Sequence, residues 1–174
     1  MPEYPPPPTA TTHSASSEPG AIEIRSGGLD DPPVRELLQT HLRQARAETA
    51  RGSAHALDLQ GLQAPDIDFW SVWRNGELLA IGALKRLPDD HFEIKSMHTT
   101  GASRRTGIAS ALLRHIIDAA RRRGARRLSL ETGSWSYFDP ARALYRKHGF
   151  VECEPFADYV PDPNSIFMML ALDA

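Results

Sequence analysis

The feature that most constrains this fold is a change of hydrophobic period near the middle of the chain. Residues 92–98 alternate apolar and polar side chains, which is the pattern of a half-buried strand. Residues 108–120 instead form an apolar stripe at helical spacing, on which Ile108, Leu112 and Ile116 lie. A short turn that contains Gly107 separates the two patterns. A strand, a tight turn and an amphipathic helix in this order predict an α/β domain, in which the helix crosses over a sheet.

The segments on either side extend this organisation. Asn75-Gly76 lies between two apolar runs and predicts a hairpin turn. Asp30 or Asp31, followed by Pro32-Pro33, predicts the start of a helix. We therefore expect a mixed sheet, made of an antiparallel meander that leads into a βαβ crossover. The expected strands are residues 21–25, 67–73, 78–84, 92–98, 127–131, 150–153 and 166–172, and the expected helices begin near residues 31, 108 and 139.

The chain of 174 residues is long enough for one domain with a sizeable core. Residues 1–19 are rich in proline, serine and threonine, and they bury too little apolar surface to offset their ordering entropy. We expect a disordered tail there, followed by a single domain at residues 20–174. No apolar run approaches the roughly 20 residues that span a bilayer, and no secretory signal precedes the domain. We therefore expect no membrane partner and a cytoplasmic location.

Several other classes of partner are also not expected. The net charge of −2 argues against nucleic acid as the main partner. The single cysteine cannot form an internal disulfide, and the histidines do not have the spacing of a metal site, so no metal is expected. A homodimer is compatible with so small a domain, although no residue pattern indicates one.

The turn Arg104-x-x-Gly107-x-Ala109 is suited to bind a diphosphate. The first N–H groups of a helix have no partner within the helix, and the helix dipole makes that end positive. Small residues at Gly107 and Ala109 let an anion approach these groups closely, and Arg104 and Arg105 add positive charge. By itself the pattern also fits a turn that closes tightly over a sheet. It is neither a Walker loop nor a GxGxxG fingerprint.

In its setting, this turn is one of several motifs that stand in a fixed order. They are Glu93–His98, Arg104–Ala109, Leu128–Glu131 and Ala141-x-x-Leu144-Tyr145-x-x-x-Gly149-Phe150. With these motifs the chain resembles the GNAT N-acetyltransferase superfamily over residues 77–172, and residues 130–133 and 158–165 resemble a group of small bacterial single-domain members. The resemblance implies a GNAT-like mixed, splayed central β-sheet flanked by helices, with acetyl-CoA as donor and CoA as product.

The resemblance also implies how the donor would bind. The pantetheine arm would lie beside the strand that precedes the turn, and the pyrophosphate would lie on the amides of the turn. A backbone N–H near Met97 or His98 would polarise the acetyl carbonyl, as an oxyanion hole does. The residues implied in cofactor binding are Met97, His98, Thr99, Arg104, Arg105, Thr106, Gly107, Ile108, Ala109 and Ser110.

Tyr145 stands where the superfamily usually has the tyrosine that protonates the departing thiolate. From the residues alone, Tyr145 is equally well explained as a ring that packs a helix onto the sheet. Many members have an asparagine seven residues before this tyrosine, where this chain has Phe138. We therefore expect that contact with the cofactor to be lost or supplied by another group.

The general base is left open between Glu93, Glu131 and His98. An amine reaches a protein mostly as ammonium, so a proton must be removed before the amine attacks. Glu93 lies where several superfamily members place a glutamate, although an ion pair with Lys95 would explain it equally well. Regular strand alternation predicts one face with Glu93, Lys95, Met97 and Thr99, and an opposite face with Phe92, Ile94, Ser96 and His98.

The acceptor is expected to be a primary amine of a small molecule or an amino acid, acetylated directly in a ternary complex. The acidic C-terminal stretch suits a cationic amine, and residues 52–65 are expected to form one wall of its site. The alternatives are a non-catalytic acyl-CoA-binding module, an enzyme that acetylates a protein amine, and a nucleic-acid binder that uses the arginines of residues 104–127. The candidate acceptor-binding residues are Trp135, Asp158, Tyr159, Asn164 and Ser165.

Overall fold

The computed structural model describes residues 20–173, so the predicted disordered tail at residues 1–19 lies outside the described residues. The predicted order of strands and long helices is confirmed. None of the helices in this part of the chain is long and apolar enough to cross a bilayer. The elements are β1 (Glu23–Ser26), α1 (Pro32–Ala47), α2 (Leu59–Leu62), β2 (Ile67–Arg74), β3 (Glu77–Leu87), β4 (His91–Thr99), η1 (Gly101–Ser103), α3 (Ile108–Arg122), β5 (Arg127–Gly133), η2 (Ser136–Phe138), α4 (Asp139–Lys147), β6 (Val151–Cys153) and β7 (Ser165–Ala171).

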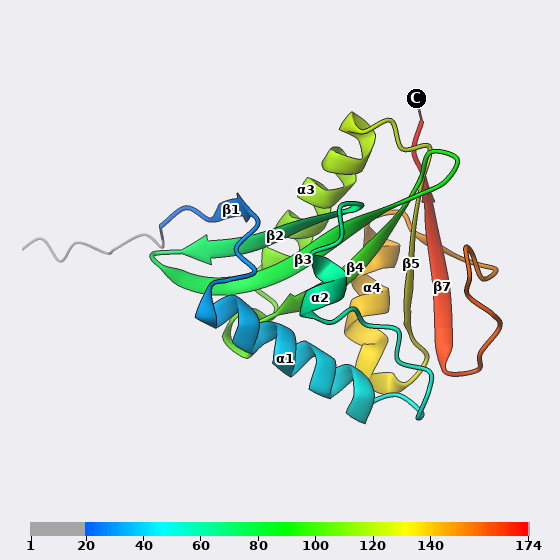
Figure 1. The fold of residues 1–174 in the computed structure, drawn as a ribbon, viewed down its shortest axis with the longest axis horizontal. Helices are drawn as coiled ribbons and strands as arrows, with labels where there is room; N and C mark the ends of the chain where they lie inside the picture. Colours follow the sequence, from blue (N-terminus) through cyan, green and yellow to red (C-terminus); the bar gives the residue numbers. More distant parts are fainter. Residues whose placement is uncertain (1–19, 174) are drawn as a thin grey trace, which may run out of the picture.

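The strands form one mixed sheet in the order β1-β2-β3-β4-β5-β7-β6 (Figure 1). β4 and β5 are parallel because α3 crosses over between them, and the other neighbouring strands are antiparallel. The hairpin between β2 and β3 turns at Asn75 and Gly76, whose φ angles of 50° and 79° are both left-handed, as a tight hairpin turn requires. The mixed α/β fold predicted from the sequence is therefore confirmed.

Helices cover both faces of the sheet (Figure 1). α3 and α4 pack on one face, where Leu113 and Ile116 are fully buried in the larger core cluster. α1 and α2 pack on the other face, where Val34 and Leu62 meet buried side chains of β2 and β3. The apolar stripe predicted on α3 is thus the stripe that is buried, as expected for an amphipathic helix on a sheet. The sheet separates two distinct environments.

The central pair of strands diverges, as the resemblance to splayed sheets predicted. β4 and β5 are paired over only three positions, from His91 opposite Arg127 to Glu93 opposite Ser129. Beyond this point β4 stays paired with β3, and β5 stays paired with β7 as far as Gly133. α4 lies behind the gap that opens between them (Figure 1). Each strand is therefore held along one edge and lacks a partner strand along the edge that faces the gap.

β4 also contains a β-bulge beside this gap. Two of its residues, Ser96 and Met97, stand opposite the single residue Gly82 of β3. Ser96 takes a left-handed φ of 55° at this point. An extra residue in one strand of a pair reverses the inward and outward alternation beyond it.

The bulge makes one part of the sequence prediction wrong. Regular alternation placed Met97 on the face of Glu93 and His98 on the opposite face. In the structure, Met97 packs against the core on the α3 side, whereas the ring of His98 contacts His41 of α1. The inserted residue places Met97 and His98 on the faces opposite to those predicted, so that His98 lies on the same side of the sheet as Glu93.

Candidate active site

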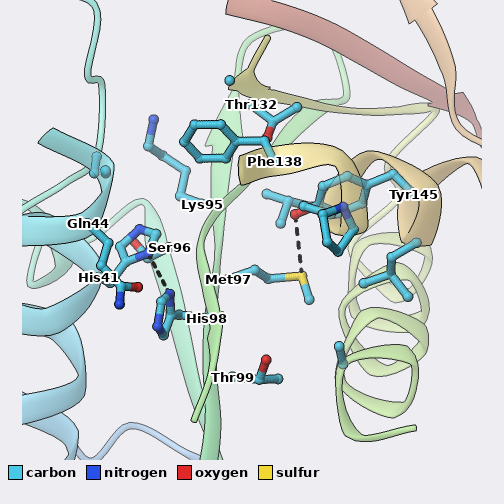
Figure 2. Close-up of a pocket in the computed structure, with 18 of the residues that line it drawn as sticks. His41, Gln44, Lys95, Ser96, Met97, His98, Thr99, Thr132, Phe138 and Tyr145 are labelled. Carbon is cyan, nitrogen blue, oxygen red and sulfur yellow. Dashed lines mark hydrogen bonds between the residues drawn. The ribbon is translucent and has the colours of Figure 1, made fainter. Parts of the chain in front are cut away.

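A cavity of about 740 Å³ lies where β4 and β5 diverge, within the size range of small-molecule sites. Its lining side chains come from both faces of the sheet, with β4 between them. Figure 2 shows His41, Gln44 and His98 on the side of α1, and Met97 and Tyr145 on the side of α3 and α4. We call these the α1 side and the α3 side of the cavity.

The α3 side ends at the turn before α3, where the backbone forms an anion-binding surface. Arg105 and Gly107 have left-handed φ angles of 60° and 82°. Ala111 donates the first hydrogen bond of α3, to Gly107, and no N–H from Arg105 to Ser110 donates a backbone hydrogen bond within residues 20–173. Successive amides in this alternating conformation form a concave site for an anion.

Space and charge around this turn fit a diphosphate. A Cβ built on Gly107 would meet nothing within 4 Å, so the turn opens onto free space. Arg104, Arg105 and Lys147 line the cavity here, which places three cations near the free amides. The side chain of Ser110 is held by a 3.1 Å contact between its Oγ and Nε2 of His148. The turn therefore has free donors, open space and positive charge together.

Tyr145 lies between this turn and the gap. Its ring is buried against Phe150, and its hydroxyl points to Sδ of Met97 at 4.0 Å, a weak contact (Figure 2). Burial, and then the nearby Glu131 carboxylate, raise the pKa of Tyr145 to about 12. The phenol is therefore protonated throughout the physiological range, and Tyr145 lines the cavity.

Glu93 is buried at the point where β4 and β5 last pair, and one of its carboxylate oxygens is hydrogen-bonded twice. Its Oε1 accepts a hydrogen bond of 2.5 Å from the Tyr159 hydroxyl and one of 3.1 Å from Nζ of Lys95. Nζ of Lys95 also lies 2.9 Å from the Tyr159 hydroxyl. Burial, and then the charge of Glu93, raise the pKa of Tyr159. Because each member is paired, this triad satisfies a buried charge.

Glu131 faces the same gap from β5 and is held differently. Its Oε1 accepts a hydrogen bond of 2.8 Å from the hydroxyl of Ser165, and no cation pairs with it among the described residues. Burial raises its pKa to about 7, against the lowering effects of the Ser165 hydroxyl and of Lys95. Near neutral pH, Glu131 therefore exchanges a proton more readily than an ordinary glutamate.

A pair of histidines forms part of the α1 side. Nδ1 of His41 and Nδ1 of His98 are 3.2 Å apart, and the two rings meet edge to face. Burial lowers the pKa of each to about 4, helped at His41 by His98 and at His98 by Arg104. Both rings are therefore neutral at pH 7. Such a contact requires one Nδ1 to carry a proton and the other to accept it.

The α1 side is bridged by contacts between segments far apart in the sequence. The hydroxyl of Tyr137, in η2, donates a hydrogen bond of 2.8 Å to Oε1 of Gln44 in α1. Residues 53–56, part of the 52–65 connection, line the cavity. Phe138 packs its ring on Gly133, where a Cβ would lie only 2.1 Å from it. Glycine at residue 133 therefore makes room for a lining side chain.

The predicted acceptor residues are placed outside the wall of the cavity. Tyr159 contacts Glu93 and Lys95, and Ser165 contacts Glu131, so both lie behind lining carboxylates. Trp135 is 43% exposed, and its Nε1 donates to Oδ1 of Asn164. Asp158 is exposed on the loop before β7.

The lining residues that sequence reasoning missed lie mainly on α1 and η2. His41 and Gln44 belong to the part of α1 that carries polar side chains, and Tyr137 follows Trp135 in a segment expected only as a connection. A histidine within an amphipathic helix was the available signal. His41 alone did not predict a site, because its partner His98 lies 57 residues away in the sequence.

Comparisons with known proteins agree with this geometry. The family model described as the acetyltransferase (GNAT) family matches residues 34–150. N-acetyltransferase YsnE of Bacillus subtilis (strain 168) is 48% identical over 147 residues, covering 84% of this chain and 97% of that protein.

Solved structures show the same fold. A protein described as an acyl-CoA N-acyltransferase from Klebsiella pneumoniae superposes with a TM-score of 0.70 at 27% identity, covering 87% of this chain and 98% of that one. A Bacillus subtilis acetyltransferase in complex with CoA has a TM-score of 0.65 at 17% identity, covering 87% and 99%. The splayed sheet, the family match and the close relative lead to one conclusion: this chain belongs to the GNAT acetyltransferase family and is an N-acetyltransferase.

Proposed function

We propose that this enzyme transfers the acetyl group of acetyl-CoA directly to a primary amine of a small molecule, with both substrates bound in one cavity. The donor occupies the α3 side, and the acceptor approaches from the α1 side. The observation that carries the proposal is the single cavity, which joins the free amides of residues 105–110 to the ionisable groups of the gap.

The α3 side fits CoA. When bound, acetyl-CoA supplies an activated acetyl thioester. The amides of residues 105–110 would hold its pyrophosphate, with Arg104 and Arg105 adding charge-assisted hydrogen bonds. The β4 edge beyond Glu93, from Met97 to Thr99, has no partner strand and would hold the extended arm through backbone hydrogen bonds. The CoA complex of the Bacillus subtilis acetyltransferase, which shares the fold, supports this placement.

Glu131 is the better candidate for the general base. One carboxylate oxygen of Glu93, Oε1, already accepts two hydrogen bonds, one of them from a lysine. Glu131 has a pKa of about 7, which suits a group that must both take and release a proton near neutrality. Glu93 then acts by holding Lys95, which lines the cavity, and Tyr159, which lies behind it. We assign no proton transfer to His98, because its pKa of about 4 makes it a weak base.

Tyr145 is the candidate general acid. It lies across the gap from the α1 side, and its raised pKa keeps its proton in place until a stronger base develops beside it. The sulfur that leaves the acetyl group beside it would first accept a hydrogen bond from the phenol and, as the carbon–sulfur bond breaks, the proton itself.

The contacts that bridge the α1 side support a small acceptor. The Tyr137–Gln44 hydrogen bond joins two walls, and residues 53–56 form a third. A protein tail would need an open groove instead. The His41–His98 pair is uncharged, so the ionisable groups near the reacting amine are those around Glu131.

The direct test is a thiol-release assay with acetyl-CoA and a panel of amines. Putrescine, tyramine, glycinamide and L-lysine sample different charges and sizes, and a peptide with a free N-terminus represents a protein acceptor. We expect release with at least one small amine and acetylation of its nitrogen by mass spectrometry. Release with the peptide alone would favour a protein amine instead.

Replacing Tyr145 by phenylalanine removes only the proposed proton donor. We expect Tyr145→Phe to lower kcat by roughly 100-fold, with the KM for acetyl-CoA changed by less than about twofold, because the ring still packs in the core. Steady-state kinetics with the accepted amine measure both values. An unchanged kcat would show that Tyr145 is structural.

A matched pair of glycine substitutions tests the anion-binding turn. Gly107 and Gly124 flank α3, have left-handed φ angles of 82° and 79°, and both face open space. We expect Gly107→Glu to abolish CoA binding, through charge repulsion and steric block at the free amides. Gly124→Glu carries the same strain and charge at the other end of the helix and should leave CoA affinity unchanged. Calorimetric titration of both variants with CoA distinguishes them.

Glu131→Gln tests the base. The wild-type kcat/KM should rise with pH through about 7, because the base must be unprotonated. The variant should lose this rise, together with roughly 100-fold or more of its kcat/KM. Retention of the wild-type pH profile would transfer the role to Glu93.

The same variant also tests the effect of Glu131 on stability: the free energy of unfolding should fall with rising pH, whereas kcat/KM should rise. The folded pKa of Glu131 is raised from 4.5 to about 7, so its contribution to stability is complete below pH 4.5 and is lost as pH rises through about 7. We expect the wild type to lose on the order of 2 kcal/mol relative to Glu131→Gln over this range, measured by urea unfolding. His41 and His98 act in the opposite direction between about pH 4 and 6.5, equally in both proteins, so their effect cancels.

A further inference from the structure

Ser96 has a backbone conformation that is unusual for its place in the fold. Its φ of 55° is left-handed, a conformation that strains residues with a Cβ. Every other non-glycine residue with a positive φ in the described range lies in a turn or loop, and Ser96 alone lies within a strand. Strain of this kind persists only where the surroundings enforce it, and it is concentrated at functional sites.

The side chain of Ser96 has a second, independent anomaly. The residue is only 7% exposed, and its Oγ is buried without a hydrogen-bond partner. The one other such atom in the described residues is Nε of Arg74, which does not line the cavity. A buried hydroxyl without a partner destabilises the folded state, so it needs an explanation.

Both anomalies fall at one place on the wall of the cavity. Ser96 lines it, at the bulge where β4 has left β5 and beside Met97. The bulge brings His98 to the α1 side and Met97 to the α3 side, so Ser96 lies at the boundary between them. A polar group here is within the part of the cavity where donor and acceptor must meet.

We propose that Ser96 positions the acceptor: its Oγ accepts a hydrogen bond from the attacking amine and directs the nitrogen lone pair toward the acetyl group. This role deepens the proposed function and rests on it. The hydroxyl lacks a partner because the amine is its partner. A rotation about the Cα–Cβ bond, which serine makes easily, turns Oγ from the wall into the cavity.

This role requires serine rather than a residue better suited to the backbone. Glycine would remove the strain at a left-handed φ but would supply no hydroxyl. Alanine would remove the unpartnered hydroxyl but would keep the strain. The proposal therefore predicts that stability and activity respond to substitution in opposite directions, as expected for a residue kept for function.

The test compares Ser96→Gly and Ser96→Ala with a matched control, Asp90→Gly. Asp90 has a similar φ of 52° in the exposed turn before β4, away from the cavity. We expect Ser96→Gly and Asp90→Gly to raise Tm by about 2–4 °C through relief of strain, and Ser96→Ala to leave Tm unchanged or higher. Both Ser96 variants should lose roughly tenfold or more in kcat/KM for the amine, with the KM for acetyl-CoA unchanged. Asp90→Gly should keep full activity.

The outcomes are distinguishable. A fall in Tm in both Ser96 variants would show that the hydroxyl is structural and would overturn the proposal. The proposal would also be overturned if the wild type and Ser96→Ala were equally active. That result would leave the proposed function unaffected. A wild type that transfers acetyl to no amine in the panel, although it binds CoA, would overturn both the proposed function and this role.

Discussion

The loss of pairing between β4 and β5 is the constraint on which the rest of the site depends. Each strand is fixed by its outer neighbour, β4 by β3 and β5 by β7, so neither can close the gap beyond Glu93. Backbone groups along a buried edge require partners, and here no strand supplies them. The fold thereby leaves unpaired strand edges in the middle of the sheet, between helices packed on both faces.

Glu93 and Glu131 both lie near the start of this gap, and their surroundings differ. Glu93 is buried with Lys95 and Tyr159, so its charge is compensated and its oxygen is occupied. Glu131 faces the same space with only a hydroxyl partner, and burial moves its pKa toward neutrality. Two carboxylates on adjacent strands thus differ because one has a cation and the other does not. The same burial keeps the proton on Tyr145.

The residues that the sequence singled out and that line the cavity are those marked by local patterns or by the resemblance. The turn before α3 stood out because free amides, small residues and arginines are all consequences of neighbouring positions, and Tyr145 stood out through the resemblance to the superfamily. The α1 side was largely missed, because its contacts join distant residues: His41 meets His98 across 57 positions, and Tyr137 meets Gln44 across 93. Helical periodicity indicates which face is polar, but it does not indicate what that face meets.

The bulge shows why even a well-predicted strand placed its side chains wrongly. Alternation is exact only while two strands advance together, and the register of β4 depends on β3. Gly82 is the deciding residue there: a Cβ would lie 3.0 Å from Ile116 and 3.2 Å from Leu112 and Met97.

Because Gly82 has no side chain, Met97 can turn toward α3, and the packed core then holds it there. The extra residue is accommodated at Ser96, whose backbone conformation is strained. The close-packed surroundings hold Ser96 in this conformation, although it is unfavourable for serine itself. Core packing on one face of the sheet thus determines which side chains line the cavity on the other.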